Sequence, residues 1–104
     1  RQMRALLAEG HDLDAVFAGS DIIAMGVLDA LREAGRRVPD DIAILGFDDI
    51  PIAANTEPPL TTIRQSISGK AERATQLLLE LIEGKVASPQ RVLLQTELVQ
   101  RAST

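Results

Sequence analysis

A chain of 104 residues with 45% hydrophobic and 25% charged residues is typical of one soluble globular domain or a piece of one. The net charge of −4 leaves no basic surface for nucleic acid, and the lack of cysteine excludes disulfides and thiolate metal sites. No apolar stretch approaches the ~20 residues of a membrane span, so no membrane partner is expected. Because the chain begins at Arg1, inside an amphipathic pattern, we expect a fragment of a longer protein.

The first half of the chain alternates helical patterns with short apolar runs. Residues 3–7 have the spacing of the last turns of a helix, and residues 15–18 are a short apolar strand. Residues 22–34 are amphipathic with a helical period, whereas residues 42–47 are nearly all apolar, which is typical of a strand buried on both faces. Three of these elements are followed by a glycine that can end them, namely Gly10, Gly19 and Gly35.

The second half continues the alternation. Residues 51–55 predict a short helical turn, and residues 60–64, which are rich in β-branched side chains and half polar, predict a strand nearer a sheet edge. Residues 67–82 form the strongest amphipathic helix, which Gly84 ends, and residues 92–99 alternate as a strand does. Strands alternating with helices over short connections predict an α/β fold, a parallel sheet with flanking helices.

Two acids, Asp48 and Asp49, follow the most apolar strand and have three candidate roles. Acids after a strand often only start a turn, through their affinity for nearby backbone donors. As a ligand site, the Asp48 carboxylate could accept hydrogen bonds from two adjacent hydroxyls of a sugar or polyol. A phospho-acceptor or Mg²⁺ site is disfavoured, because the sequence lacks the further acids and the lysine that a receiver domain needs.

Ser20 and Asp21 follow the first strand as Asp48 follows the second. If the two strands are parallel, both loops emerge on one rim of the sheet and can meet at one crevice. Both residues are also good helix caps for residues 22–34. We expect one of them to cap the helix and the other to face the crevice.

The sequence offers no basis for catalysis. His11 is the single histidine, and neither a cysteine nor a second histidine accompanies it, so a metal site or a nucleophilic triad is not expected. No phosphate-binding loop is present, and no cofactor or enzyme activity is predicted. Met25 lies off the buried helical stripe, where it either meets a partner subunit or adds a second layer of core.

Two motifs carry a family resemblance: VPDDIAILGFDD at residues 38–49 and, after a short connection, PPLTTIRQ at residues 58–65. With them, residues 20–65 resemble the C-terminal half of the ligand-binding core of LacI-type (lactose-repressor family) bacterial transcriptional regulators. Weaker similarity extends over residues 15–101. The resemblance implies the type I fold of periplasmic sugar-binding proteins, of which this chain would be the C-terminal portion.

In that fold, residues 15–64 and 91–101 would form the C-subdomain. The helix over residues 66–84 would pack on an N-subdomain that this sequence does not contain. An isolated chain of these 104 residues is therefore expected to be unstable, oligomeric or swapped with a second copy.

The resemblance also implies roles for single residues. Ser20 stands where many relatives have an asparagine, so a contact there would be weaker or pass through water. The implied effector contacts are Asp48, Ser20, Asp21, Phe47 and Gln65, while Asp49 is expected only to form the turn. The implied homodimer contacts are Met25, Asp29, Ala53, Ala54, Asn55 and Thr56.

The implied function is a cytoplasmic, ligand-responsive transcriptional regulator without enzyme activity. Its effector would be a small molecule, a sugar or related polyol or alternatively a nucleobase, and operator DNA would be bound only through a headpiece outside this sequence. The alternative is a periplasmic or receptor-type sugar-binding protein of the same fold, which a signal peptide upstream would indicate.

Overall fold

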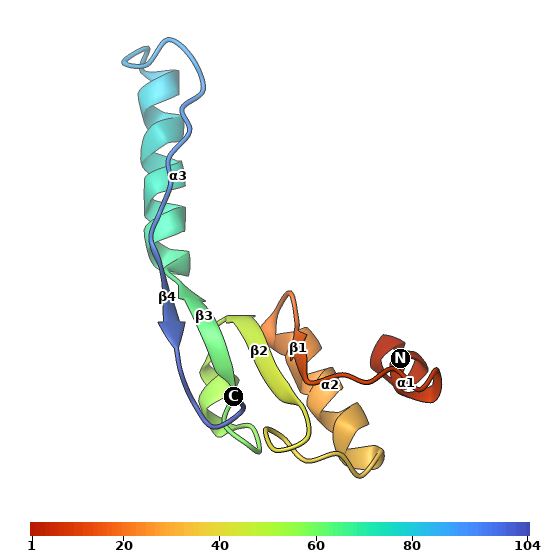
Figure 1. Ribbon diagram of the computed structural model, residues 1–104. Coiled ribbons are helices and arrows are strands. Elements are labelled where there is room, and N and C mark those ends of the chain that lie inside the picture. Colours follow the sequence, from red (N-terminus) through yellow and green to blue (C-terminus); the bar gives the residue numbers. More distant parts are fainter. The chain divides into compact units, whose positions relative to one another are not determined.

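The computed structural model describes every residue from Arg1 to Thr104. In chain order the elements are α1 (Gln2–Ala8), β1 (Ala15–Phe17), α2 (Asp21–Glu33), β2 (Ala43–Asp48), the 3₁₀ helix η1 (Pro51–Asn55), β3 (Thr61–Gln65), α3 (Ile67–Ile82) and β4 (Thr96–Val99) (Figure 1). The chain divides into two compact units, a first unit of residues 1–64 with 97–104 and a second unit of residues 65–96.

The sheet has the strand order β1-β2-β3-β4. β1 pairs with β2 and β2 with β3 in parallel, with Val16 opposite Ile44 and Leu45 opposite Thr61. β4 runs antiparallel to β3 at the edge of the sheet (Figure 1). The predicted α/β fold is confirmed, and the sheet is mixed, because an antiparallel edge strand joins an otherwise parallel sheet, as is common in such folds.

The core of the first unit lies between α2, η1 and one face of the sheet. The helical spacing of α2 turns Ala24, Val27, Leu28 and Leu31 to the inside, and Leu31 has no exposed surface. These side chains pack in one cluster with Ile44, Leu60 and Ala53. Each fully buried Leu or Ile side chain contributes about 1.5–3 kcal/mol, so this layer fixes how β2 is presented.

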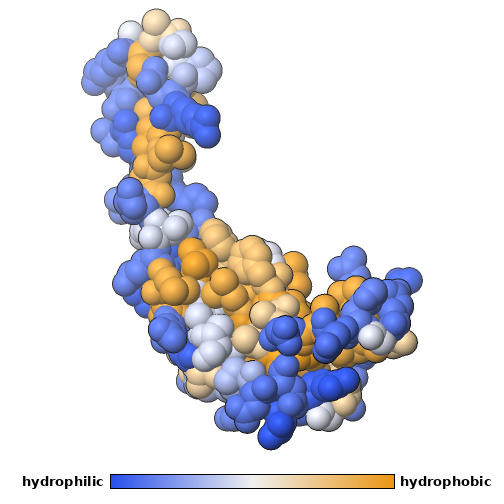
Figure 2. Space-filling model, in the orientation of Figure 1, coloured by the Kyte–Doolittle hydropathy of each residue, from blue (hydrophilic) through white to orange (hydrophobic).

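The opposite face of the sheet is only partly covered, so the prediction that β2 is buried on both faces is wrong for this chain. Ile44 is fully buried, whereas the alternate residues Ala43, Leu45 and Phe47 are half-buried. Phe17 of β1 is 62% exposed. Figure 2 shows the apolar surface that these strands present.

The second unit is built around α3. The Ser66 hydroxyl accepts a hydrogen bond from the backbone N–H of Gly69 at 3.0 Å, so Ser66 caps the helix. No residue of α3 is buried, and large apolar side chains such as Ile82 are exposed. The packing of this helix on another subdomain stays a prediction.

Element ends differ from the sequence prediction mainly at the last strand. β4 covers only Thr96–Val99, whereas residues 92–99 were predicted. Its neighbour β3 ends at Gln65, so the residues before Thr96 have no strand to pair with. The predicted helix stop at Gly35 is confirmed, since this residue takes φ +68° after the α2 C-cap.

Candidate functional site

The carboxyl ends of β1 and β2 form a polar rim. The two strands are parallel and paired, with Phe17 opposite Leu45, so the residues that follow them emerge at the same edge of the sheet. Asp48 is the last residue of β2 and Ser20 follows β1. The Ser20 hydroxyl accepts a hydrogen bond from the Ile23 N–H at 3.2 Å, so Ser20 is the residue that caps α2.

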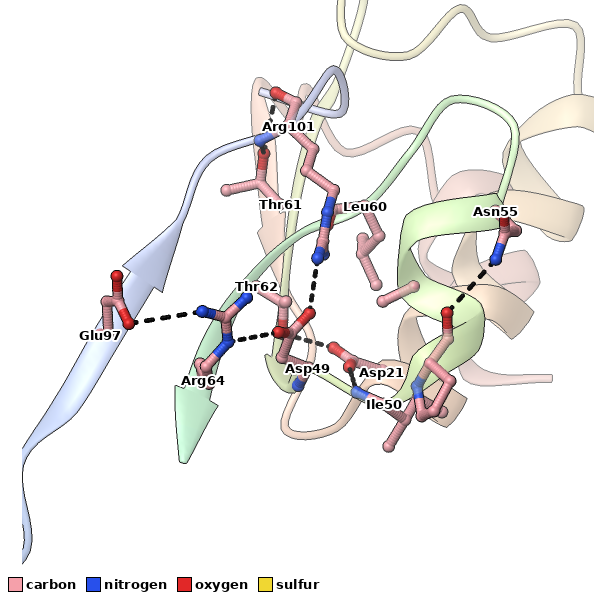
Figure 3. Close-up of polar contacts among 12 residues, drawn as sticks. Asp21, Asp49, Ile50, Asn55, Leu60, Thr61, Thr62, Arg64, Glu97 and Arg101 are labelled. Atoms are coloured by element: carbon pink, nitrogen blue, oxygen red, sulfur yellow. Dashed lines mark hydrogen bonds and ion pairs between the residues drawn. The ribbon is translucent and has the colours of Figure 1, made fainter. Parts of the chain in front are cut away.

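Asp21 does not face a crevice. Its side chain is fully buried, with Oδ1 accepting a hydrogen bond from the Thr62 hydroxyl at 2.5 Å and Oδ2 accepting one from the Ile50 N–H at 2.9 Å (Figure 3). The implied direct effector contact at Asp21 therefore needs correction, because a ligand would have to displace Thr62 or Ile50 to reach it. In this structure Asp21 ties α2 to β3 and to the start of η1.

The close approach of Asp21 to β2 depends on Gly46. A Cβ atom at this position would overlap the Asp21 Oδ1 and lie 2.9 Å from Leu60 Cδ2. Both neighbours are packed, so neither can move away without loss. The glycine two residues before Asp48 is thus required by packing beneath the rim.

The main chain turns sharply at the end of β2. Asp48 has φ +117° and Asp49 has φ +55°, values that residues other than glycine rarely adopt. Such conformations cost about 1–3 kcal/mol each and persist only where the surroundings hold them. Asp48 and its neighbour Phe47 are half-buried, so both lie at the rim with part of their surface open.

Asp49 is far more than a turn residue. Its side chain is 9% exposed and lies between two guanidinium groups, with 2.7 Å from Arg64 Nε to Asp49 Oδ2 and 2.7 Å from Arg101 Nη2 to Asp49 Oδ1. Burial raises the pKa of Asp49, but the hydrogen bonds from Arg64 and Arg101 outweigh it and hold the pKa below its usual value. The prediction that Asp49 only forms a turn is therefore incomplete.

The last residues of the chain complete the sheet beside this cluster. The Ser103 carbonyl accepts a hydrogen bond from the Ile44 N–H at 2.8 Å, and its hydroxyl donates to the Ile44 carbonyl at 2.7 Å. Arg101 Nη1 donates to the Leu60 carbonyl at 2.8 Å. These bonds hold the C-terminal segment between β2 and the start of β3. They therefore fix the position of the Arg101 backbone, from which its side chain reaches Asp49.

Sequence reasoning missed Arg64 and Arg101. The weak local signal for Arg64 is that it is the one charged residue in the predicted strand of residues 60–64. No local signal exists for Arg101, which lies 52 positions from Asp49 in the chain.

Gln65 is described with the second unit. Its side-chain carbonyl accepts a hydrogen bond from Lys70 Nζ at 2.6 Å. The structure therefore brings Ser20, Phe47 and Asp48 to one rim of the first unit. Gln65 ends β3, one residue after Arg64, which pairs with Asp48, and its implied effector contact stays a prediction.

Most residues implied for the dimer share one surface of the first unit. Met25 and Asp29 on α2 line a shallow groove together with Asn55 and Thr56 from η1 and the residue after it. Ala54 is exposed, but Ala53 has no exposed surface, which corrects its implied role as a partner contact. Ile52, which is 45% exposed, lines the same groove and was not anticipated.

Neither metal-binding nor membrane-spanning features are present. No cluster of three or more His, Asp or Glu side chains is arranged to hold a metal ion. None of the helices combines the length and apolar character that crossing a membrane requires.

A sheet with parallel strands that end in a polar rim is the architecture of α/β ligand-binding domains. The chain belongs to the periplasmic binding protein-like domain family, whose profile matches residues 1–104, in the form found in LacI-type transcriptional regulators.

Two curated relatives illustrate the match. The HTH-type transcriptional regulator CelR of Thermobifida fusca is 42% identical over 101 residues, which are 97% of this chain and 30% of the relative. The HTH-type transcriptional repressor PurR of Escherichia fergusonii is 42% identical over 103 residues, 99% of this chain and 30% of the relative. The chain thus spans about 30% of the length of these relatives.

Solved structures give the same result. A complex of the transcriptional regulator CelR with cellobiose has a TM-score of 0.93 at 41% identity, over 98% of this chain and 31% of that one. A lac repressor dimer bound to operator and the anti-inducer ONPF has a TM-score of 0.92 at 34% identity, over 99% of this chain and 36% of that one. The family resemblance and the periplasmic-binding-protein-like fold predicted from the sequence are confirmed.

Proposed function

We propose that this chain is the effector-binding and dimerisation portion of a ligand-responsive transcriptional regulator. The observation that carries the proposal is the rim at the ends of β1 and β2, where Asp48 takes a strained left-handed conformation in a chain that matches LacI-type regulators. Strained backbone concentrates at ligand-binding positions, where it presents a side chain at a defined angle.

The chemistry of the rim favours a hydroxylated effector. One lone pair of the Ser20 hydroxyl is already used by the Ile23 N–H, which leaves its O–H free to donate to a ligand. An ionised Asp48 carboxylate can only accept hydrogen bonds. A sugar hydroxyl can accept from Ser20 and donate to Asp48, and Phe47 adds an apolar wall beside them.

The similarity to the CelR–cellobiose complex supports a sugar or related polyol as the effector class. A nucleobase is the second candidate, because the chain is equally similar in sequence to the repressor PurR. In either case the effector would bind one arrangement of the whole protein better than another, and so shift its population and its affinity for operator DNA.

The partners follow from the same proposal. The groove of α2 and η1 would pair with a second copy in a homodimer, and operator DNA would be bound by a part of the protein outside this sequence. Such a regulator would act in the bacterial cytoplasm and would not be an enzyme. The matched relatives are transcriptional regulators, which favours this function over a periplasmic or receptor-type sugar-binding protein.

The test is a thermal-shift screen of the full-length protein against cellobiose, other sugars and nucleobases, followed by an operator mobility-shift assay with each stabilising compound. The proposal predicts that one sugar raises the unfolding temperature and also changes operator affinity. Stabilisation by a nucleobase alone would replace the sugar assignment. A compound that stabilises the protein without any change in DNA binding would contradict the regulatory role.

A further inference from the structure

Four charged side chains form one connected chain of ion pairs below the rim (Figure 3). Arg101 contacts Asp49 at 2.7 Å, Asp49 contacts Arg64 at 2.7 Å, and Arg64 contacts Glu97 at 3.5 Å. Asp49 and Arg101 are the enclosed members, with side-chain exposures of 9% and 19%. Arg64 and Glu97 are more open, at 50% and 70%.

The cluster joins segments that are far apart in the sequence. Asp49 directly follows the rim residue Asp48, and Arg101 belongs to the C-terminal segment that Ser103 fastens to β2. Arg64 is the residue at which the chain leaves the first unit, and Glu97 is the residue at which it returns. The four side chains therefore connect the residue after β2 with the last residue of the first unit before the second unit and with the first residue after it.

Asp48 and Asp49 are consecutive residues with positive φ, and neither is glycine. A free chain would relax such a pair to extended or right-handed backbone, so contacts must hold it. The Asp49 N–H lies 3.4 Å from the Thr62 hydroxyl, which is a weak restraint. The two charge-assisted hydrogen bonds at 2.7 Å hold the Asp49 side chain, and the Asp21 carboxylate accepts a further one from the Ile50 N–H at 2.9 Å, so charged partners restrain both sides of this turn.

We propose that Asp49 is a positioning residue: gripped by Arg64 and Arg101, it holds the left-handed turn and thereby sets the orientation of the Asp48 carboxylate toward the effector. Asp49 itself does not touch the effector. The proposal rests on the proposed function to the extent that Asp48 is an effector contact.

The first measurement needs no ligand. Hydrogen exchange of the Asp49 amide is compared in the full-length wild type, Arg101→Gln, Asp49→Asn and the control Arg37→Gln. Arg37 is a suitable control because it makes a similar pair of bonds to Asp41 in an exposed loop, at 2.9 and 3.1 Å. We expect exchange about tenfold faster in the first two variants and unchanged exchange in the control.

The second measurement is calorimetric titration of the same proteins with cellobiose. Arg101→Gln and Asp49→Asn should weaken cellobiose binding about tenfold, and Arg37→Gln should not. In an Asp48→Ala background the Arg101→Gln change should have no further effect, because the carboxylate that it positions is gone. A purely structural ion pair would lower stability without this non-additivity.

Unchanged exchange in Arg101→Gln and Asp49→Asn would overturn the proposal. So would faster exchange accompanied by wild-type affinity for cellobiose, since the cluster would then stabilise the fold without orienting Asp48. A wild-type protein that binds no cellobiose would count against cellobiose as the effector instead; the titration would then use the compound that stabilises the wild type, and the exchange comparison would still decide whether Asp49 holds the turn.

Discussion

Three aspartates lie near the end of β2, and the structure gives each a different task. Asp48 occupies the rim, Asp49 is gripped by two arginines, and Asp21 is buried beneath them with both oxygens hydrogen-bonded. The difference comes from surroundings rather than from residue type, since only the partners and the exposure distinguish these carboxylates.

Gly46→Ala tests the packing beneath the rim. The added methyl group would overlap the Asp21 carboxylate and press on Leu60, so the free energy of unfolding should fall by about 1–3 kcal/mol. The matched control is Gly26→Ala in α2, where nothing lies within 4 Å and where alanine should be neutral or stabilising. Urea unfolding of the full-length protein measures both, and an equally stable Gly46→Ala variant would count against this packing.

Asp49 should make the stability depend on pH in the acid range. Its pKa is lowered in the folded protein, so its contribution is complete above the unfolded pKa of about 3.9 and is lost as the pH falls through the folded pKa. The wild type should therefore exceed Asp49→Asn by about 2 kcal/mol near neutral pH, and the difference should shrink below about pH 4. Urea unfolding of both proteins at several pH values checks this, and a difference independent of pH would contradict it.

At the scale of elements, local sequence patterns predict most of the first unit. The apolar residues of α2 recur at helical spacing and those of β2 form a continuous run. Because the period of the apolar residues follows from which face is buried, it predicts both elements. The length of β4 was overestimated because a strand also needs a partner, and the pairing partner depends on chain far away. The alternation of residues 92–95 carries no information about whether a partner strand lies beside them.

The sequence predicts the rim of the site but not the contacts beneath it. Parallel strands predict that Ser20 and Asp48 meet at one edge, and this requires only the element order. The grip of Arg101 on Asp49 arises because the C-terminal segment enters the sheet beside β2, a contact across 52 positions that no local pattern encodes. The burial of Asp21 likewise depends on Thr62, which belongs to another strand.

Ser20 gives a prediction about the α2 element. Ser20→Ala removes the acceptor for the Ile23 N–H and should lower the free energy of unfolding by about 1 kcal/mol. Ser20→Asn keeps a capping oxygen, so its stability should stay close to that of the wild type. Thermal unfolding of both variants compares them with the wild type. Equal losses in the two would show that the capping oxygen is not the cause, and an unchanged Ser20→Ala variant would show that the cap contributes nothing.

For the whole molecule, the groove between α2 and η1 is the surface proposed for the homodimer. Ile52→Lys places a charge on an apolar side chain that is 45% exposed at this groove, so it should weaken self-association of the full-length protein about tenfold or more. Asp12→Lys, on an exposed loop outside the groove, is the control. Sedimentation equilibrium measures both, and a dimer of unchanged strength in Ile52→Lys would place the interface elsewhere.

The central claim is that the Asp48 carboxylate binds the effector. Its most direct test is calorimetric titration of full-length Asp48→Ala with the sugar that stabilises the wild type, beside Asp40→Ala, which removes an exposed acid in the loop before β2. The account predicts a loss of about 10- to 100-fold in affinity for Asp48→Ala, intact operator binding without effector, and no change for Asp40→Ala. Wild-type affinity in Asp48→Ala would contradict it.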